Sequence, residues 1–542
     1  MDGLLGAPEP VHHHVAHGGR ITRTQRHLLL PVLHAIQDRV GWVSRGALEY
    51  ACRRLSIPPA EAYGVVSFYA RFALEPRGEV TVHVCDDIVC QLVDAIDAPE
   101  GARRVPCLGL CDRAPATLTE RFGAVYEAVQ SAHPPFRQPG SKLLRRIGVV
   151  DPESIESYRD HGGFAALKRA REMGPAAIIR AVTEAGLLGR GGAAFPTGRK
   201  WQSVADQPVR PHYLVCNADE SEPGTFKDRV LLENDPFALV EGMAIAAFAT
   251  GCEKAYVYVR DEYPLARERV ARAIKEAREH GYLDFDVEVR RGAGAYICGE
   301  ETALFNSIEG KRGEPRNKPP FPVQVGLFGK PTLPNNVETL VNVLEVLTLG
   351  GEAYAQIGTT DSTGSRLFCL SGCVERPGVY EVEHGITLRE LLETAGGVRG
   401  GKELKAILLG GAAGSFVTSD DLDLRLTFED SKAAGVTLGS GVVMAFDEDV
   451  DLTDIVLRIA AFFRDESCGQ CVPCRVGTVR QEEALARVIS GRASGSLTDE
   501  LALIDEIGQV MRDASICGLG QLAANAVDSA IHRLKIFDGG AA

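Results

Sequence analysis

Three cysteines stand at two-residue spacings in one short stretch, and a fourth follows later in the chain. The set is Cys468, Cys471, Cys474 and Cys517. Thiolates at this spacing can converge on one small inorganic centre, which indicates iron–sulfur ligation and most simply a [4Fe–4S] cluster. A four-thiolate structural zinc is the alternative, although zinc sites usually present two separate pairs of ligands. Because a cluster moves one electron at a time, we expect the chain also to hold a group that supplies or receives electrons.

A second group of cysteines lies in the N-terminal part of the chain and comprises Cys85, Cys90, Cys107 and Cys111. Residues 79–84, just before the first of them, are predicted to form a strand. Four thiolates on two loops after strands suit a [2Fe–2S] centre, with zinc or unligated thiols as alternatives. The chain has 14 cysteines and no secretory signal at its N-terminus. We therefore expect reduced thiols, metal ligation and a cytoplasmic location.

Glycine-rich turns and carboxylates form a third set of candidates. Residues 189–201 contain closely spaced glycines and Lys200, and residues 217–228 place several carboxylates directly after a predicted strand. Closely spaced glycines let backbone N–H groups approach a phosphate, and carboxylates can accept hydrogen bonds from ribose or ribityl hydroxyls. A plain turn and a solvated acidic loop are the alternatives, and the glycine run is not the dinucleotide fingerprint G-x-G-x-x-G.

The elements that must position these residues can be predicted from periodicity. Apolar residues at three- and four-residue spacing predict three helical regions. These are residues 22–72, 151–188 and 454–534. Between the last two regions, predicted strands at 213–216, 255–259 and 285–289 alternate with helices. This alternation favours a largely parallel α/β sheet.

Length and charge restrict the classes of protein. A chain of 542 residues is too long for one hydrophobic core, so several domains are expected. The formal net charge of −14 argues against nucleic acid and anionic membrane as partners. No apolar run reaches the ~18 residues that a membrane-spanning helix needs.

Three motifs in the N-terminal part carry a resemblance to a known family. They are Gly41-Trp42-Val43, Tyr63-Gly64-Val65-Val66-Ser67-Phe68-Tyr69 and Cys107-Leu108-Gly109-Leu110-Cys111-Asp112-Arg113-Ala114-Pro115. This part resembles the 24 kDa-type subunit of respiratory NADH dehydrogenase. The resemblance implies a helical bundle followed by a thioredoxin-like [2Fe–2S] domain. The interval between Cys90 and Cys107 is shorter than in that family, so we expect a helix and a strand to be trimmed.

The remainder, from about residue 151 to residue 534, resembles the 51 kDa-type, NADH-oxidising flavoprotein subunit of the same enzyme. The family also occurs as the diaphorase subunit of NAD-linked formate dehydrogenases and hydrogenases. Its motifs follow one another in a specific order. They lie at residues 189–201, 217–228, 292–302, 316–322 and 334–339. Residues 366–409 resemble the ubiquitin-like (SLBB) β-grasp module of that family.

The resemblance implies a multidomain α/β fold with a Rossmann-like FMN/NAD domain. The predicted parts are a disordered tail (1–20), a helical bundle (21–76), a thioredoxin-like [2Fe–2S] domain (77–130), a linker (131–150), an FMN/NAD-binding α/β domain (151–360), an SLBB β-grasp domain (361–447) and a C-terminal helical bundle with the [4Fe–4S] site (448–542).

The resemblance also implies site residues. The FMN contacts carried over are Gly189, Gly191, Lys200, Asn217, Asp219, Tyr296, Gly299, Glu300, Asn335, Asn336 and Thr339. The NAD(H) contacts carried over are Gly192, Phe195, Glu222, Glu301, Lys318 and Phe321. Glu301 near the nicotinamide and Glu222 at a ribose are the candidates for catalytic residues, and the two aromatic rings would stack on adenine. Ala194 stands where family members often have glycine.

The implied function is electron transfer between NAD(H), FMN and the clusters. Flavin converts a two-electron hydride into single electrons, and the [2Fe–2S] and [4Fe–4S] clusters pass those on. The sequence contains no pattern for a molybdopterin, nickel or quinone site, so the chain is predicted to be one subunit of a complex. The fusion of both parts is most like the β subunit of NAD-dependent formate dehydrogenase, whose α subunit holds molybdenum or tungsten. A hydrogenase diaphorase, a respiratory NADH dehydrogenase subunit and a non-catalytic zinc scaffold are the alternatives.

Overall fold

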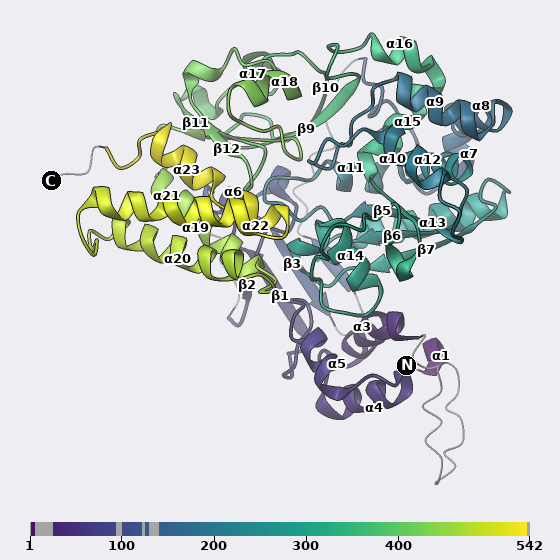
Figure 1. Cartoon of the computed structure of the whole chain (residues 1–542), viewed down its shortest axis with the longest axis horizontal. Coiled ribbons are helices and arrows are strands. Elements are labelled where there is room, and N and C mark those ends of the chain that lie inside the picture. The colour runs from purple at the N-terminus through teal and green to yellow at the C-terminus, as the bar shows by residue number, and fades with distance from the viewer. Residues whose placement is uncertain (1, 6–24, 94–99, 122–124, 129–139, 539–542) are drawn as a thin grey trace.

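The structure is a computed structural model, and it describes residues 2–5, 25–93, 100–121, 125–128 and 140–538 (Figure 1). The predicted disordered tail lies almost wholly outside the described residues, apart from the short helix α1 (Asp2–Leu5). No described helix combines the length and the apolar character that crossing a membrane requires.

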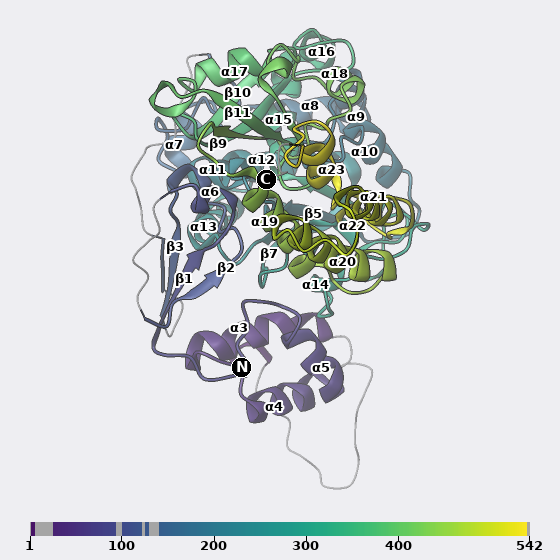
Figure 2. The same ribbon diagram turned by 90° about the vertical axis from the view of Figure 1, so that its left-hand side faces the viewer.

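A small helical bundle begins the chain, as the periodicity predicted. It contains η1 (Arg26–Leu28), α3 (Leu29–Val40), α4 (Arg45–Leu55) and α5 (Pro59–Val66). Helix α3 ends at Gly41, whose φ of 79° suits a residue without a Cβ, and the Ser44 hydroxyl caps α4 by accepting from the Ala47 N–H. Figure 2 shows the bundle at one end of the molecule.

A four-stranded sheet follows, in the order β2-β1-β3-β4. Its elements are β1 (Val80–Cys85), α6 (Ile88–Gln91), β2 (Arg103–Val105), η2 (Cys111–Arg113), β3 (Thr117–Arg121) and β4 (Val125–Ala128). Strands β1 and β2 are parallel, and the other pairs are antiparallel. Helix α6 has four residues and β2 has three, in keeping with the short interval between Cys90 and Cys107.

This N-terminal half is held to the rest of the chain by buried polar contacts. The Arg71 side chain pairs with Asp261 (Nε to Oδ2, 2.9 Å), and both side chains are at most 5% exposed. The Arg71 backbone N–H donates to Ala293 O at 3.0 Å. Arg291 pairs with Asp38 of α3 at 2.8 Å. The halves are therefore joined across a polar, specifically paired surface.

The stretch predicted as a linker is packed where the structure describes it. Within residues 140–150, Leu143, Leu144 and Ile147 are buried. The Glu381 carboxylate accepts from the backbone N–H groups of three successive residues, 142–144. Because apolar side chains in this stretch find a core to enter, it joins the neighbouring domains instead of spacing them apart.

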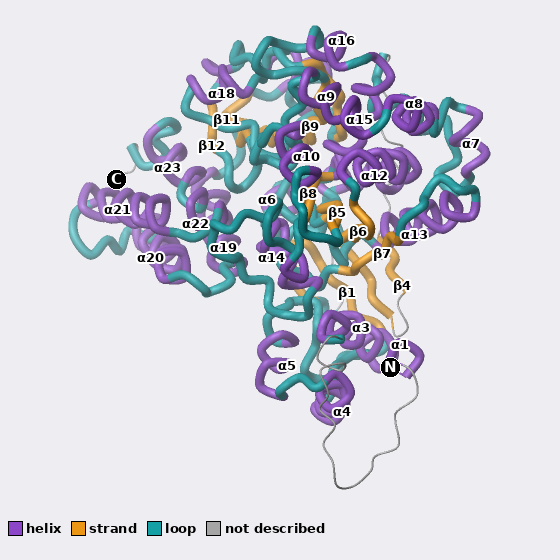
Figure 3. The backbone as a smooth tube through the Cα atoms, turned by 45° about the vertical axis from the view of Figure 1, so that its right-hand side comes forward, coloured by secondary structure: helices purple, strands orange, loops and turns teal. Residues whose placement is uncertain are grey.

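The central domain is built on a parallel sheet in the order β7-β6-β5-β8, as the strand–helix alternation predicted (Figure 3). The strands are β5 (His212–Ala218), β6 (Cys252–Val259), β7 (Asp286–Arg291) and β8 (Thr332–Asn336). Its helices are α7 (Ile155–Asp160), α8 (Ala165–Met173), α9 (Pro175–Glu184), α10 (Thr197–Ala205), α11 (Lys227–Asn234), α12 (Pro236–Thr250), α13 (Pro264–Glu279), η3 (Tyr296–Gly299), α14 (Glu301–Ile308), η4 (Leu327–Gly329), α15 (Val337–Leu349) and α16 (Gly351–Ala355). Parallel strands present their carboxyl ends at one edge, where ligand sites usually form.

A second, five-stranded sheet with its own core follows in the order β10-β9-β13-β11-β12. Its elements are β9 (Ser365–Gly372), β10 (Gly378–Glu383), α17 (Leu388–Thr394), η5 (Arg399–Gly401), β11 (Leu404–Leu409), β12 (Ser415–Val417), η6 (Ser419–Asp421), α18 (Phe428–Ala433) and β13 (Val442–Asp447). Strands β9 and β13 are parallel, whereas the other pairs are antiparallel. The mixed sheet with a helix after its first hairpin is the expected β-grasp arrangement.

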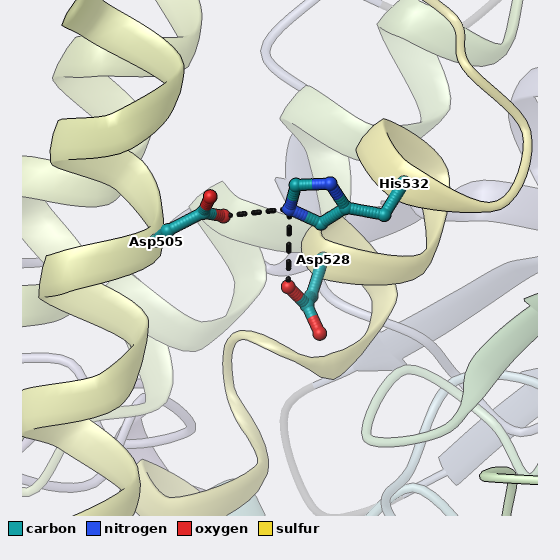
Figure 4. Close-up of side chains that lie close together, drawn as sticks. All are labelled: Asp505, Asp528 and His532. Atoms are coloured by element: carbon teal, nitrogen blue, oxygen red, sulfur yellow. Dashed lines mark hydrogen bonds and ion pairs between the residues drawn. The ribbon is translucent and has the colours of Figure 1, made fainter.

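The chain ends in α19 (Leu452–Glu466), α20 (Val472–Ile489), α21 (Leu497–Ala514), α22 (Gly518–Leu522) and α23 (Asn525–His532). His532 lies between Asp505 of α21 and Asp528 of α23, at 2.9 and 3.6 Å from its Nε2 (Figure 4). The hydrogen bond from Asp505 raises the pKa of His532. These side chains are 41–55% exposed, so we assign them to holding α21 against α23.

Candidate redox site

The first cysteine set converges in the C-terminal helical bundle. Cys468 and Cys471 lie in the loop between α19 and α20, Cys474 lies in the first turn of α20, and Cys517 directly precedes α22. All four line one small cavity, closed by the apolar side chains of Ile297, Pro315, Ile516 and Leu519. Burial raises the pKa of Cys474 to about 11 and that of Cys517 to about 12. Four thiols gathered in an apolar cavity fit a cation-rich cluster that would hold them as thiolates.

The second cysteine set also converges, on the four-stranded sheet. Cys85 ends β1, Cys90 lies in α6, and the other two lie in the loop leading into η2. The sulfurs of Cys107 and Cys111 are 3.5 Å apart, and the Cys85 thiol has its pKa raised by hydrogen bonds with Cys107 and then Cys90. Leu108, Leu110 and Leu118 surround the group. The two thiol pairs thus form one buried set, as the spacing predicted.

The glycine-rich loop between α9 and α10 lies against the end of β8. A Cβ added to Gly191 would come within 3.2 Å of the Asn336 Cβ, so this contact favours glycine. The backbone N–H of Arg190 donates to Thr339 Oγ1 at 2.8 Å. Trp201 donates through Nε1 to Asn335 Oδ1 at 3.0 Å, which fixes that amide. The predicted FMN residues of the loop and of β8 are therefore neighbours.

Asn217 and Asp219 lie at the carboxyl end of β5, and Gly299 lies beside them. The Asn217 amide donates to Gly299 O at 2.8 Å and accepts from the Asp219 N–H at 3.1 Å. Asp219 Oδ2 is buried and has no hydrogen-bond partner among the described residues. Burial raises the pKa of Asp219 to about 8. A buried acceptor without a partner fits a ligand that brings hydroxyl donors, such as the ribityl chain of a flavin.

Charged side chains gather where α10 meets α14. Lys318 Nζ lies 2.7 Å from Glu301 Oε1 and 3.0 Å from Glu300 Oε1, and Lys200 Nζ lies 3.8 Å from Glu301 Oε2. Glu300 also caps α14 by accepting from the Thr302 and Ala303 N–H groups. Burial lowers the pKa of Lys200, so a bound phosphate would favour its charged form.

The two aromatic residues expected to stack on adenine are both open to solvent. Phe195 is 44% exposed and Phe321 is 52% exposed, and the Lys200 ammonium lies 5.6 Å from the Phe195 ring centroid. Ala194, next to Phe195, has a φ of +51°. A left-handed conformation costs a residue with a Cβ roughly 1–2 kcal/mol, which explains why glycine suits this position.

Glu222 faces the β-grasp domain. Its carboxylate accepts from the Ala413 N–H at 2.9 Å and from Ser440 Oγ at 3.1 Å, and burial raises its pKa to about 7. It also lies close enough to Tyr296 to contribute, after burial, to the raised pKa of that phenol. A ribose bound here would meet a carboxylate that already has two donors.

Tyr296 links the cavity to the first cysteine set. Its backbone N–H donates to Glu466 Oε2 at 2.8 Å, and Glu466 lies two residues before Cys468. Its ring packs against Phe462 of α19, with centroids 5.1 Å apart. Sequence reasoning missed Glu466, although its place beside a cysteine motif could have drawn attention to it. The segment that carries Gly299, Glu300 and Glu301 therefore starts at the cluster cavity.

Family models match most of the chain. They describe a thioredoxin-like [2Fe–2S] ferredoxin (residues 16–103), the Nuo51 FMN-binding domain (182–345), an SLBB domain (366–455) and the NADH-ubiquinone oxidoreductase-F iron–sulfur binding region (454–535). The first match ends before Cys107 and Cys111, which the fold nevertheless brings to Cys85 and Cys90. Together the matches and the geometry define an NAD-dependent flavin and iron–sulfur oxidoreductase subunit, with FMN, a [2Fe–2S] and a [4Fe–4S] cluster as cofactors.

Relatives of known function narrow the class. The F subunit of the NADH-quinone oxidoreductase of Aquifex aeolicus is 44% identical over 401 residues, covering 72% of this chain and 92% of the relative. The HoxS subunit alpha of the NAD-reducing hydrogenase of Cupriavidus necator is 34% identical over 549 residues, covering 92% and 89%. A chain of the crystal structure of an NAD⁺-reducing [NiFe]-hydrogenase in the H₂-reduced state aligns with a TM-score of 0.80 and 34% identity, covering 95% and 92%. The chain belongs to the family of these NAD(H)-linked FMN and iron–sulfur subunits, in a form that fuses the 24 kDa-like and 51 kDa-like parts.

Proposed function

We propose that the chain is the diaphorase subunit of a complex in which a separate subunit holds a catalytic metal. It would exchange a hydride between NAD(H) and FMN, and single electrons would travel between the clusters and the partner. Bound FMN supplies the conversion between two-electron and one-electron transfer. The observation that carries the proposal is the segment from Tyr296 to Glu301, which joins the flavin-cavity residues to the cavity lined by Cys468 and Cys517.

The chain's own residues bind and orient. Asn217 and Asp219 would receive the ribityl hydroxyls, and Lys200 with the glycine loop would hold the phosphate. Phe195 and Phe321 would stack on adenine and Glu222 would bind a ribose hydroxyl. Glu301, fixed between Lys318 and Lys200, would position the nicotinamide. Hydride transfer needs no side-chain acid or base, so these residues act by placing the reactants.

The face around the first cysteine set suits a protein partner. Cys468, Cys471 and Cys517 are only half-buried. Val472 and Val476 of α20 are 59% and 45% exposed, and Ile516 is 37% exposed. Apolar side chains around a redox centre favour a docking surface, and close approach of the partner shortens the path for the electron.

Two kinds of partner remain candidates. The alignment over almost the whole chain with NAD-reducing hydrogenase subunits favours a hydrogenase partner, because the Aquifex aeolicus relative covers 72% of the chain. A formate dehydrogenase α subunit with molybdenum or tungsten is the second candidate, on the resemblance of the fused arrangement. The cytoplasmic location stays a prediction.

Purification of the native complex tests the proposal. We expect bound FMN, iron, rapid reduction of ferricyanide by NADH, and a partner that contains nickel with hydrogen-dependent NAD⁺ reduction. Molybdenum or tungsten with formate-dependent reduction would select the second candidate. Protein that holds zinc at both cysteine sets, without flavin, would refute the diaphorase function.

A further inference from the structure

Arg260, which directly follows β6, lies between the two halves of the chain and is 3% exposed. Its Nη1 donates to Glu220 O at 2.6 Å, and its Nη2 donates to Cys107 O at 2.7 Å. One guanidinium therefore joins the backbone of a predicted [2Fe–2S] ligand to the loop that also carries Asp219. Its Nε lies 3.1 Å from Glu262 Oε2, the carboxylate that partly balances its charge.

The loop from Asp219 to Thr225 reaches both centres. At one end, Asp219 Oδ2 is the buried acceptor without a partner in the flavin cavity. At the other end, the Gly224 backbone N–H donates to the Cys111 thiol. A hydrogen bond to a cluster sulfur stabilises the more negative, reduced state of a cluster. The same short loop can therefore position the flavin and influence the cluster.

The cysteine loop is fitted closely against this region. Gly109 has a φ of +68°, and a Cβ added there would overlap the Tyr263 ring. The Tyr263 hydroxyl donates to Glu220 O at 3.3 Å. Arg229 donates through Nε to Gly109 O at 3.1 Å and pairs with Asp112 at 2.7 Å. No side chain longer than hydrogen can stand at Gly109, so Cys107 comes as close to the flavin-binding loop as the backbone allows.

We propose that Arg260 is a positioning residue that sets the reduction potential of the [2Fe–2S] centre while fixing that centre to the flavin-binding loop. The inference rests on the proposed function, because it takes the four cysteines to hold this cluster. Reduction adds one negative charge to the cluster, and a buried cation bonded to the backbone of a ligand favours that charge. Glu262 opposes the effect, since it lies against the same guanidinium.

The charged groups around the cluster leave this role to Arg260. Asp87 accepts from the Cys107 N–H at 3.1 Å and lies 3.7 Å from Arg458. Arg229 is paired with both Asp112 and Glu233. Arg260 has a single carboxylate partner, Glu262, so more of its charge is left to act on the cluster.

The test is a redox titration of the [2Fe–2S] centre, followed by electron paramagnetic resonance, in the full-length holoprotein. For Arg260→Met we expect reduction to become at least tenfold less favourable, a fall of about 59 mV for one electron. For Glu262→Gln we expect the opposite sign, with reduction at least threefold more favourable. Arg113→Met removes a cation from the same loop that is paired with Asp112, and we expect less than a twofold change.

Iron and flavin contents measured on each sample separate the outcomes. Should Arg260→Met lose its cluster or fail to fold, Glu262→Gln decides, because a merely structural Arg260 gives no reason for the potential to rise. Unchanged or lowered potential in Glu262→Gln, or unchanged potential in an intact Arg260→Met, overturns the inference and leaves the proposed function standing. Wild-type protein that contains zinc and no [2Fe–2S] signal overturns the proposed function itself.

Discussion

Replacement of Lys200 by methionine removes one positive charge from the flavin cavity while keeping most of the side-chain length. Lys200 Nζ donates to Pro334 O at 3.2 Å and lies 3.8 Å from Glu301, so part of its hydrogen-bonding capacity is free for a phosphate. A hydrogen bond to a charged group contributes about 1.5–3 kcal/mol. Since 1.4 kcal/mol is a factor of ten, we expect Lys200→Met to weaken FMN binding by about 10- to 150-fold.

The assay is a titration of deflavinated protein with FMN, followed by the quenching of flavin fluorescence. Lys311→Met is the matched control, because Lys311 is 46% exposed and pairs with Glu309 at the far end of α14. The control should bind FMN as the wild type does. A dissociation constant for Lys200→Met within a factor of two of the wild-type value would refute the assignment of Lys200 to the phosphate.

Three further changes test other parts of the site. Cys474→Ala should lower the iron content from about six to about two per chain while FMN and NADH oxidation by ferricyanide persist, and partner-linked turnover that survives without the cluster would contradict this outlet. Val472→Glu combined with Ile516→Glu should weaken partner binding at least tenfold in a pull-down titration, whereas Val510→Glu, an equally exposed position on α21, should not; equal effects would exclude the proposed face. Glu222 has its pKa raised from 4.5 to about 7, so the folded protein holds a proton that the unfolded chain has lost, and this contribution to stability disappears as the pH rises through that window. Glu222→Gln should therefore unfold at nearly the wild-type temperature at pH 5 and gain at most about 3 kcal/mol over the wild type at pH 8; a constant difference across that range would show that Glu222 does not titrate there.

Sequence reasoning located the two cysteine sets and the parallel sheet because both depend on local patterns. The C-x-x-C-x-x-C spacing allows three thiols on one loop to converge, and the fold places Cys468, Cys471 and Cys474 around one cavity. Alternation of strands with helices is likewise visible within short windows. The ligand and contact roles of individual residues stay predictions.

What the sequence could not give are the contacts between distant segments. Arg260 bonds to a residue 153 positions earlier, and Glu381 bonds to a stretch 237–239 positions earlier. Neither residue stands in a recognisable motif, and an isolated arginine or glutamate reads as surface charge. The same lack of local signal explains why residues 140–150 looked like a linker from their prolines and glycine, although their leucines are buried.

The polar surface between the two halves bears on how the protein can be assembled. Its ion pairs, such as Arg71 with Asp261, and its backbone hydrogen bonds form between side chains and peptide groups that require no covalent continuity. Joining the halves in one polypeptide raises their effective concentration and guarantees a one-to-one ratio, but it adds no contact of its own. Two separately synthesised fragments, divided between the halves, should therefore recombine into a stable heterodimer.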